Sequence, residues 1–125
     1  MSLRDPLAVA RGLGSARNGT GHWWALRLTS IALLFLAPWF LVLLHGLVGA
    51  DRFAIQMLLA RPLNGALMIA WVLTVFWHAQ LGLQVVIEDY VHGRAEWALQ
   101  IMVRFLCVVG AIASVLAVCR IVFAA

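Results

Sequence analysis

The stretch "HAQLGLQVVIEDYVH" (78–92) places two histidines, an acid pair and a tyrosine at the end of a long apolar run. Ionisable side chains are costly inside a membrane, so those that occur there are usually part of a functional site. Imidazole binds metals, and a phenol beside a carboxylate can donate a hydrogen bond to a carbonyl and relay protons. The residue types therefore indicate a metal ligand and, nearer water, a polar site linked to proton transfer.

Helical spacing places His78, Gly82 and Asp89 on one face. Gly82 lies one turn after His78, where a missing side chain leaves room for a flat ligand. Asp89 follows His78 by eleven residues, which returns it to within about 20° of the same direction and roughly 16 Å along the axis. Haem held by an axial imidazole suits a histidine at this depth. Asp89 and Tyr90 are predicted to meet a quinone carbonyl at the membrane edge, because quinone reduction needs protons as well as electrons.

A second axial ligand is predicted to come from another polypeptide. If the first span enters the membrane near residue 28, His45 lies about 26 Å along it, whereas His78 lies about 18 Å from the inner end of its own span. Two ligands of one iron must lie at a similar depth. His45 is therefore interpreted as a packing or interfacial residue.

Structural explanations stand beside these functional ones. A lone histidine in a span can simply bond to a neighbouring helix, and for His78 this alternative predicts no cofactor at all. Glu88 is best explained as part of a solvated helix end. Trp23, Trp24, Trp71, Trp77 and Trp97 are interpreted as interfacial anchors or packing residues.

The elements that carry these residues are predicted from composition. The chain has 125 residues, of which 65% are hydrophobic and only 11% charged, too few polar groups for a soluble domain of this size. Residues 28–50 and 62–87 contain no charged side chain, and 97–121 is interrupted only by two arginines. About 20 apolar residues cross a bilayer, so the sequence predicts an all-α integral membrane protein with three transmembrane helices running up, down and up.

The predicted organisation is a polar, glycine-rich cytoplasmic segment at 1–22 and a membrane domain at 23–125. Its helices are expected at about 24–50, 63–91 and 97–122, with Pro38 bending the first and Gly93 in the tight second turn. Residues 51–65 are expected to form a short loop along the outer surface. Three helices make a thin bundle, so packing against partner subunits is predicted.

Seven of the nine arginines lie outside the apolar stretches 28–50, 62–87 and 97–121, and the chain has no lysine. This distribution favours a role in topology over nucleic-acid binding and places the N-terminus in the cytoplasm. Cys107 and Cys119 are about 18 Å apart on one predicted helix, too far for a disulfide.

The stretch at 78–92 resembles the signature of the hydrophobic membrane-anchor subunits of succinate dehydrogenase (respiratory complex II), in which His-Ala-x-x-Gly is followed by an Asp-Tyr pair. "LGSARNGTGHWWALRLTSIALL" (13–34) is similar to that family's entry into its first helix. The resemblance covers most of the chain, but only the 78–90 motif is specific. It implies a bacterial inner-membrane location and three partners, which are a companion anchor subunit, an iron–sulfur subunit and a flavoprotein subunit.

The resemblance also implies roles for individual residues. His78 is expected to be an axial ligand of haem b iron, with Gly82 beside it and the second histidine on the companion anchor subunit. Tyr90 is expected to hydrogen-bond ubiquinone with support from Asp89. By the same resemblance, Arg27 and His22 are expected near the haem propionates or the quinone pocket.

The chain itself lacks a flavin fingerprint and a cysteine cluster. Succinate oxidation would therefore belong to the partner subunits, and this chain would contribute to the quinone site. Two rival interpretations stay open: a haem-free structural, assembly or small transporter subunit, and an anchor of a fumarate reductase that works in the reverse direction.

Overall fold

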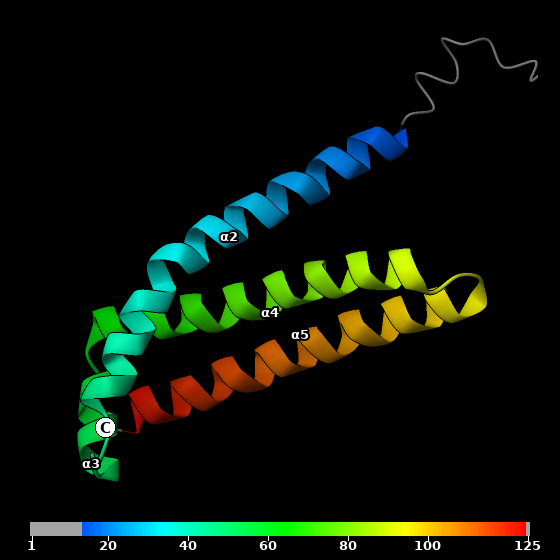
Figure 1. Cartoon of the computed structure of the whole chain (residues 1–125). Coiled ribbons are helices and arrows are strands. Elements are labelled where there is room, and N and C mark those ends of the chain that lie inside the picture. Colours follow the sequence, from blue (N-terminus) through cyan, green and yellow to red (C-terminus); the bar gives the residue numbers. More distant parts are fainter. Residues whose placement is uncertain (1–13, 125) are drawn as a thin grey trace, which may run out of the picture.

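A computed structural model describes residues 14–124 of the chain, and this part folds into helices joined by short links (Figure 1). The helices are α2 (Gly14–Gly46), α3 (Arg52–Leu59), α4 (Pro62–Tyr90) and α5 (Arg94–Phe123), with no strand among the described residues. Three segments are long and apolar enough to cross a membrane: Thr20–Gly46, Pro62–Tyr90 and Arg94–Phe123. The predicted all-α fold with three spans is confirmed.

The first long helix begins earlier than the sequence predicted. Residues 14–22 are helical, although glycines in this stretch had indicated irregular chain because each costs up to about 1 kcal/mol in a helix. Extending an existing helix avoids the cost of nucleating a new one, so the apolar span continues outward through this segment. The rest of the predicted polar segment, residues 1–13, lies outside the described residues.

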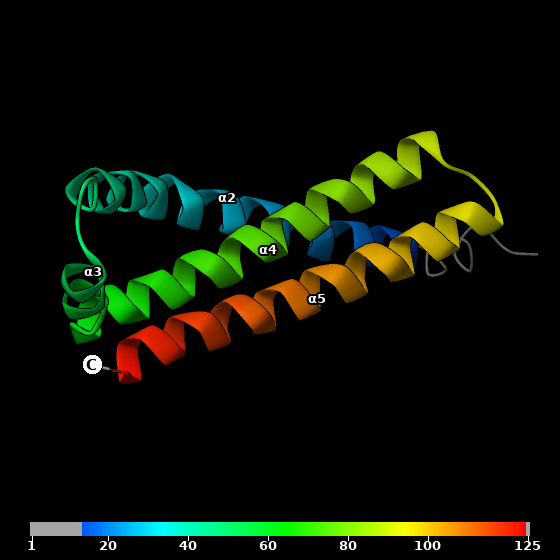
Figure 2. The ribbon, with the colours of Figure 1, turned by 90° about the horizontal axis from the view of Figure 1, so that it is seen from below.

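The link at 51–65 was predicted as a loop and contains a short helix. The Asp51 carboxylate accepts a hydrogen bond from the Ala54 backbone N–H at 2.8 Å and caps α3, and Pro62 opens α4. The Asn64 side-chain amide donates to the Leu58 carbonyl at 3.0 Å and ties α4 to α3. The sequence signal for this helix was Asp51, a residue type that favours the N-cap position. Seen from below, α3 lies at the end of the molecule where α4 begins (Figure 2).

The three long helices form a layer with α4 in the middle. α4 packs against both α2 and α5, whereas α2 and α5 have no extensive contact with each other. α2 changes direction around Pro38 (Figure 1), where the missing N–H interrupts the backbone hydrogen bonds. At the end where α4 finishes, α2 and α4 diverge in both views (Figures 1 and 2).

The outer faces of this layer are apolar and uncovered. Large exposed side chains include Phe35 at 73%, Val42 at 74%, Phe105 at 67% and Trp97 at 76%. The few buried apolar side chains of the described part are Leu43, Leu59, Leu81, Ile87 and Val118. Such exposure is compatible with lipid or with a companion subunit and not with water, which agrees with the prediction of a thin bundle.

Two ring contacts hold α4 in place. Phe40 of α2 stacks on Trp71 of α4 with ring centroids 4.6 Å apart, so Trp71 is a packing residue as predicted. On the other side, Phe76 of α4 lies against Gly110 of α5, where a Cβ would be only 2.7 Å from the ring. Gly110 therefore permits close approach of α4 and α5.

Gly110→Val should weaken this contact by about 1–3 kcal/mol, because the added side chain overpacks the space that Phe76 fills. The measurement is the Tm of the purified membrane complex in detergent. Gly46→Val is the matched control, since a Cβ there meets nothing within 4 Å. Equal Tm values for the two variants would contradict the assigned packing role of Gly110.

Candidate functional site

The predicted ligand His78 lies in the interior of α4 and is hydrogen-bonded to α2. Its Nδ1 is 2.8 Å from the hydroxyl oxygen of Thr29, a residue only 2% exposed. The same hydroxyl lies 2.8 Å from the carbonyl oxygen of Ala25 and 3.1 Å from that of Leu26. The hydroxyl group of the buried Thr29 is thereby fully hydrogen-bonded, as a polar group inside a membrane span requires.

These distances indicate which ring nitrogen of His78 carries the proton. The Thr29 hydroxyl has one hydrogen, and two backbone carbonyl oxygens, which can only accept, lie beside it. Turning that hydrogen towards His78 would leave the hydroxyl lone pairs facing a carbonyl oxygen at 2.8 Å. The hydroxyl therefore donates to the backbone and accepts a hydrogen bond from Nδ1–H of His78. In a neutral imidazole this leaves the Nε2 lone pair free, and Nε2 forms no hydrogen bond with the described residues.

Open space lies beside Gly82, one turn further along α4. A Cβ at Gly82 would meet nothing within 4 Å, although Gly82 is half-buried. The other glycines inside α4 and α5 differ: a Cβ at Gly65 would lie 3.0 Å from the Leu59 carbonyl oxygen, and one at Gly110 would meet Phe76. Packing within the chain explains those two glycines and does not explain Gly82. The room at Gly82 is available to a group from outside the chain.

The acid pair and the tyrosine form the last turn of α4. Tyr90 is 81% exposed and Asp89 is also exposed. Glu88 accepts a hydrogen bond from the Gln84 amide at 3.0 Å, in keeping with its interpretation as a helix-end residue. The Asp89 carboxylate has no hydrogen bond or ion pair within the part of the chain that the structure covers. Asp89 and Tyr90 are thus available to a ligand or to another subunit.

A row of polar side chains along α4 was not predicted from the sequence. The Gln80 amide donates to Gln84 at 3.4 Å, and Gln84 in turn donates to Glu88. The signal was the spacing of four residues between the three, which places neighbours one turn apart. This row leads from the level of His78 to the helix end.

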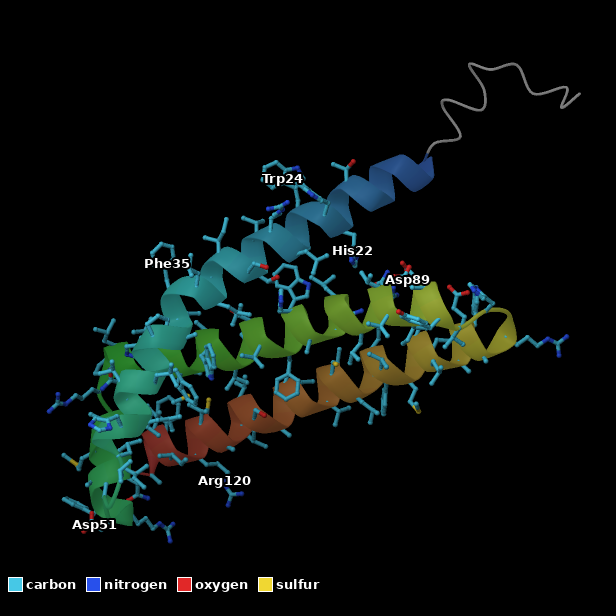
Figure 3. All side chains as sticks on the ribbon, viewed as in Figure 1. His22, Trp24, Phe35, Asp51, Asp89 and Arg120 are labelled. Carbon is cyan, nitrogen blue, oxygen red and sulfur yellow. The ribbon has the colours of Figure 1, made fainter. Side chains whose placement is uncertain are left out.

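His22 lies on the side of α2 that faces α4. It precedes Thr29 by seven residues, which places it within about 20° of the same direction and about 10 Å along the axis. In Figure 3 the His22 side chain points from α2 towards α4, and Asp89 points from the end of α4 towards α2. The Nε2 atom of His22 is buried and has no hydrogen-bond partner among the described residues. A buried polar atom of this kind is costly unless a further group pairs with it.

Arg27 occupies a different side of α2. It is two residues from Thr29, which turns it by about 160° from the direction of His78. Its guanidinium carbon lies 5.0 Å from the centre of the Trp23 ring, a cation–π contact, and its side chain is exposed. The structure therefore brings His22 to the α4 side and leaves Arg27 away from His78.

His45 lies in the last turn of α2, near α3, and its side chain is exposed. Because Thr29 is level with His78, sixteen residues of α2 separate His45 from that level, about 24 Å along the helix. The two histidines thus differ in depth, as predicted, and by more than the sequence estimates of about 26 Å and 18 Å implied. Cys107 and Cys119 are free thiols, also as expected.

The described donor groups suit a haem that takes only one ligand from this chain better than a bare metal ion. Within residues 14–124 no cluster of three or more His, Cys, Asp or Glu side chains could hold a bare metal ion. Haem iron needs only one imidazole from each of two helices, and the open space at Gly82 lies one helical turn from His78.

Comparisons with known proteins identify the family of the chain. Residues 1–118 match the family model described as "Succinate dehydrogenase/Fumarate reductase transmembrane subunit". A succinate dehydrogenase hydrophobic membrane anchor subunit of Rickettsia bellii is 34% identical over 93% of this chain and 94% of its own length. The subunit of the same name from Paracoccus denitrificans is 30% identical over 78% of this chain and 76% of its own. No solved structure gives a significant match. The chain belongs to the family of succinate dehydrogenase and fumarate reductase transmembrane subunits, as a hydrophobic membrane-anchor subunit of the succinate dehydrogenase type.

Proposed function

We propose that this anchor subunit contributes one axial ligand to a haem b and part of the site at which ubiquinone is reduced with electrons from succinate. The observation that carries the proposal is the hydrogen bond between His78 Nδ1 and Thr29, which leaves Nε2 as a lone-pair donor in the interior of a membrane span. The open space at Gly82 supports it, since a flat macrocycle bound at His78 needs room one turn along the helix.

Haem b, when bound, supplies a one-electron carrier close to the quinone site. In this proposal His78 holds the iron, with the second axial histidine on the companion anchor subunit. His22 pairs through its buried Nε2 with a propionate or a quinone oxygen, because no group of the described chain satisfies that atom. The exposed Arg27 lies on another side of α2, so any contact with a propionate would involve its long side chain reaching around the helix.

At the end of α4, Tyr90 donates a hydrogen bond from its phenol to a ubiquinone carbonyl. Asp89 orients that phenol and exchanges protons with water. Both side chains are exposed and neither is engaged by another described residue, which leaves them available for these roles. Each ubiquinone takes up two electrons and two protons to become ubiquinol, and this end of α4 contributes to the supply of protons.

The partners follow from the same proposal. Succinate is oxidised in a flavoprotein subunit, and an iron–sulfur subunit passes the electrons to the membrane part. The companion anchor subunit covers apolar faces that this chain leaves open. The complex lies in the bacterial inner membrane with the N-terminus of this chain in the cytoplasm. The names of the relatives favour succinate oxidation over fumarate reduction as the direction of catalysis.

One observation also favours a haem-free structural role. A bond from His78 to a neighbouring helix is what that alternative predicted, and the bond to Thr29 is present. The bond uses Nδ1 alone, however, and a purely structural histidine explains neither the free Nε2 nor the space at Gly82. The two functions differ in what a side chain at Gly82 would do.

Gly82→Leu should abolish the reduced b-type absorption bands of the purified complex and leave its subunits assembled. The substitution meets no atom of this chain within 4 Å of the new Cβ, and leucine favours a helix over glycine by up to about 1 kcal/mol. Haem per complex is measured by absorption and the assembled subunits by gel. The conservative control is Gly82→Ala, which should keep most of the haem. Full haem content in Gly82→Leu would contradict the proposed haem position.

A further inference from the structure

The hydrogen bond between α2 and α4 points to a residue that the sequence motif did not contain. We infer that Thr29 is a positioning residue for the iron ligand: its hydroxyl accepts from Nδ1–H of His78 and thereby holds the tautomer and ring orientation in which Nε2 is the donor atom. This inference rests on the proposed haem ligation by His78.

The neighbours of the Thr29 hydroxyl set the direction of its hydrogen bond with His78. The two carbonyl oxygens beside the Thr29 hydroxyl, at 2.8 Å and 3.1 Å, take its single hydrogen. The hydroxyl can then only accept from His78, at 2.8 Å. The backbone of α2 thus orients the hydroxyl, and the hydroxyl orients the imidazole of α4.

The Thr29 side chain is held rigidly. Thr29 is 2% exposed, and its β-branched side chain has restricted χ1 freedom in a helix. Its neighbour Ser30 has an exposed side chain whose hydroxyl donates to the Leu26 carbonyl at 2.7 Å and does not contact His78. The hydroxyls of Thr29 and Ser30 therefore both donate to a backbone carbonyl of the preceding turn, but only Thr29 is also hydrogen-bonded to His78.

A hydrogen bond at Nδ1 affects how strongly the imidazole binds a metal through Nε2. A histidine that binds a metal usually donates its other N–H to an acceptor, which fixes its orientation and raises its basicity as a ligand. Loss of such an acceptor typically weakens metal binding by about 10–100-fold. A less basic imidazole donates less charge to ferric iron, so the midpoint potential of the haem should rise when the Thr29 hydroxyl is removed.

The experiment compares Thr29→Val, Thr29→Ser and Ser30→Ala in the complete purified complex. Thr29→Val keeps the branched shape without the hydroxyl and should lower haem affinity about 10–100-fold, change the low-spin EPR signal of the remaining haem and raise its midpoint potential. Thr29→Ser keeps a hydroxyl and should show wild-type haem affinity, EPR signal and midpoint potential. Ser30→Ala should leave these three quantities unchanged. If Thr29→Val prevents assembly, Thr29→Cys, with a much weaker acceptor of similar size, should shift the EPR signal and the potential in the same direction.

Assembled Thr29→Val or Thr29→Cys complexes with wild-type haem content, EPR signal and potential would overturn the inference, even with a lowered Tm, because a helix-packing role alone predicts that result. His78→Ala in the same series separates the two proposals. If His78→Ala loses the haem and the Thr29 variants keep it unaltered, only the positioning role of Thr29 is excluded. If His78→Ala keeps the haem, haem ligation by His78, on which the inference rests, is excluded as well.

Discussion

Complexes that carry His78→Ala are expected to lose their b-type haem. Loss of the hydrogen-bond acceptor behind a metal-binding histidine costs about 10–100-fold in metal affinity, and removal of the ligand itself should cost more than about 100-fold. The absorption spectrum of the dithionite-reduced complex measures the effect. Oxidation of succinate with an artificial acceptor should continue, because the chain contributes no residue to that step in the proposed function.

His45→Ala is the matched control for that experiment. His45 is the other histidine within the long apolar runs, and it lies about 24 Å along α2 from the level of His78. This variant should keep the haem bands. Retained bands in His78→Ala together with lost bands in His45→Ala would exchange the two assignments and place the haem at the opposite end of the spans.

Most features that depend on local sequence were predicted correctly, whereas the contacts between helices at the site were not predicted. The three spans were predictable because uncharged runs of more than about 20 residues have few alternatives in a bilayer. His78, Gly82 and Asp89 lie on one continuous helix, as their spacing predicted, because helical periodicity is a local property. The start of α2 at Gly14 was not predicted. The helix penalty of each glycine was considered separately, without the stabilisation that a segment gains when it extends a long helix.

Thr29 was the main omission at the site. It is 49 residues from His78 in the sequence, and no local pattern marks two residues that meet only when helices pack. The spacing of His22 and Thr29 gave a partial signal, because seven residues return a helix almost to the same face. That signal could identify the side of α2 that faces a partner, but not which helix the partner is.

Arg27 makes a local contact within the chain, and its expected contact with anionic groups stays a prediction. An arginine at the start of a span was expected beside anionic groups, yet its guanidinium lies over Trp23, four residues before it. A side chain one helical turn away can bind Arg27 in place of a more distant partner. This local contact requires little further loss of conformational entropy, because the helix already holds both residues in place. The residues that converge between α2 and α4 are therefore Thr29, His78 and, nearer the helix ends, His22.

Tyr90→Phe is expected to lower the rate of ubiquinone reduction by about 100-fold or more. A positioned proton donor contributes roughly 10²–10⁴-fold to a reaction, and phenylalanine keeps the ring while it removes the hydroxyl. Tyr90 is 81% exposed within the chain, so the substitution removes no packing from α4 and the helix should remain intact. The assay compares succinate oxidation coupled to a soluble ubiquinone analogue with succinate oxidation coupled to a dye that bypasses the membrane part.

The expected pattern is selective, with quinone-coupled activity lost and dye-coupled activity and haem bands unchanged. Trp97→Phe is the matched control, because Trp97 is also an exposed aromatic residue (76%) and lies in the first turn of α5, just after the turn that follows Tyr90. An equal loss of both activities in Tyr90→Phe would show damage to the whole complex and refute a specific role. An unchanged quinone rate would mean that the proton donor is elsewhere, and Asp89, whose carboxylate is unpaired within the described chain, would then be the first side chain to replace with Asn.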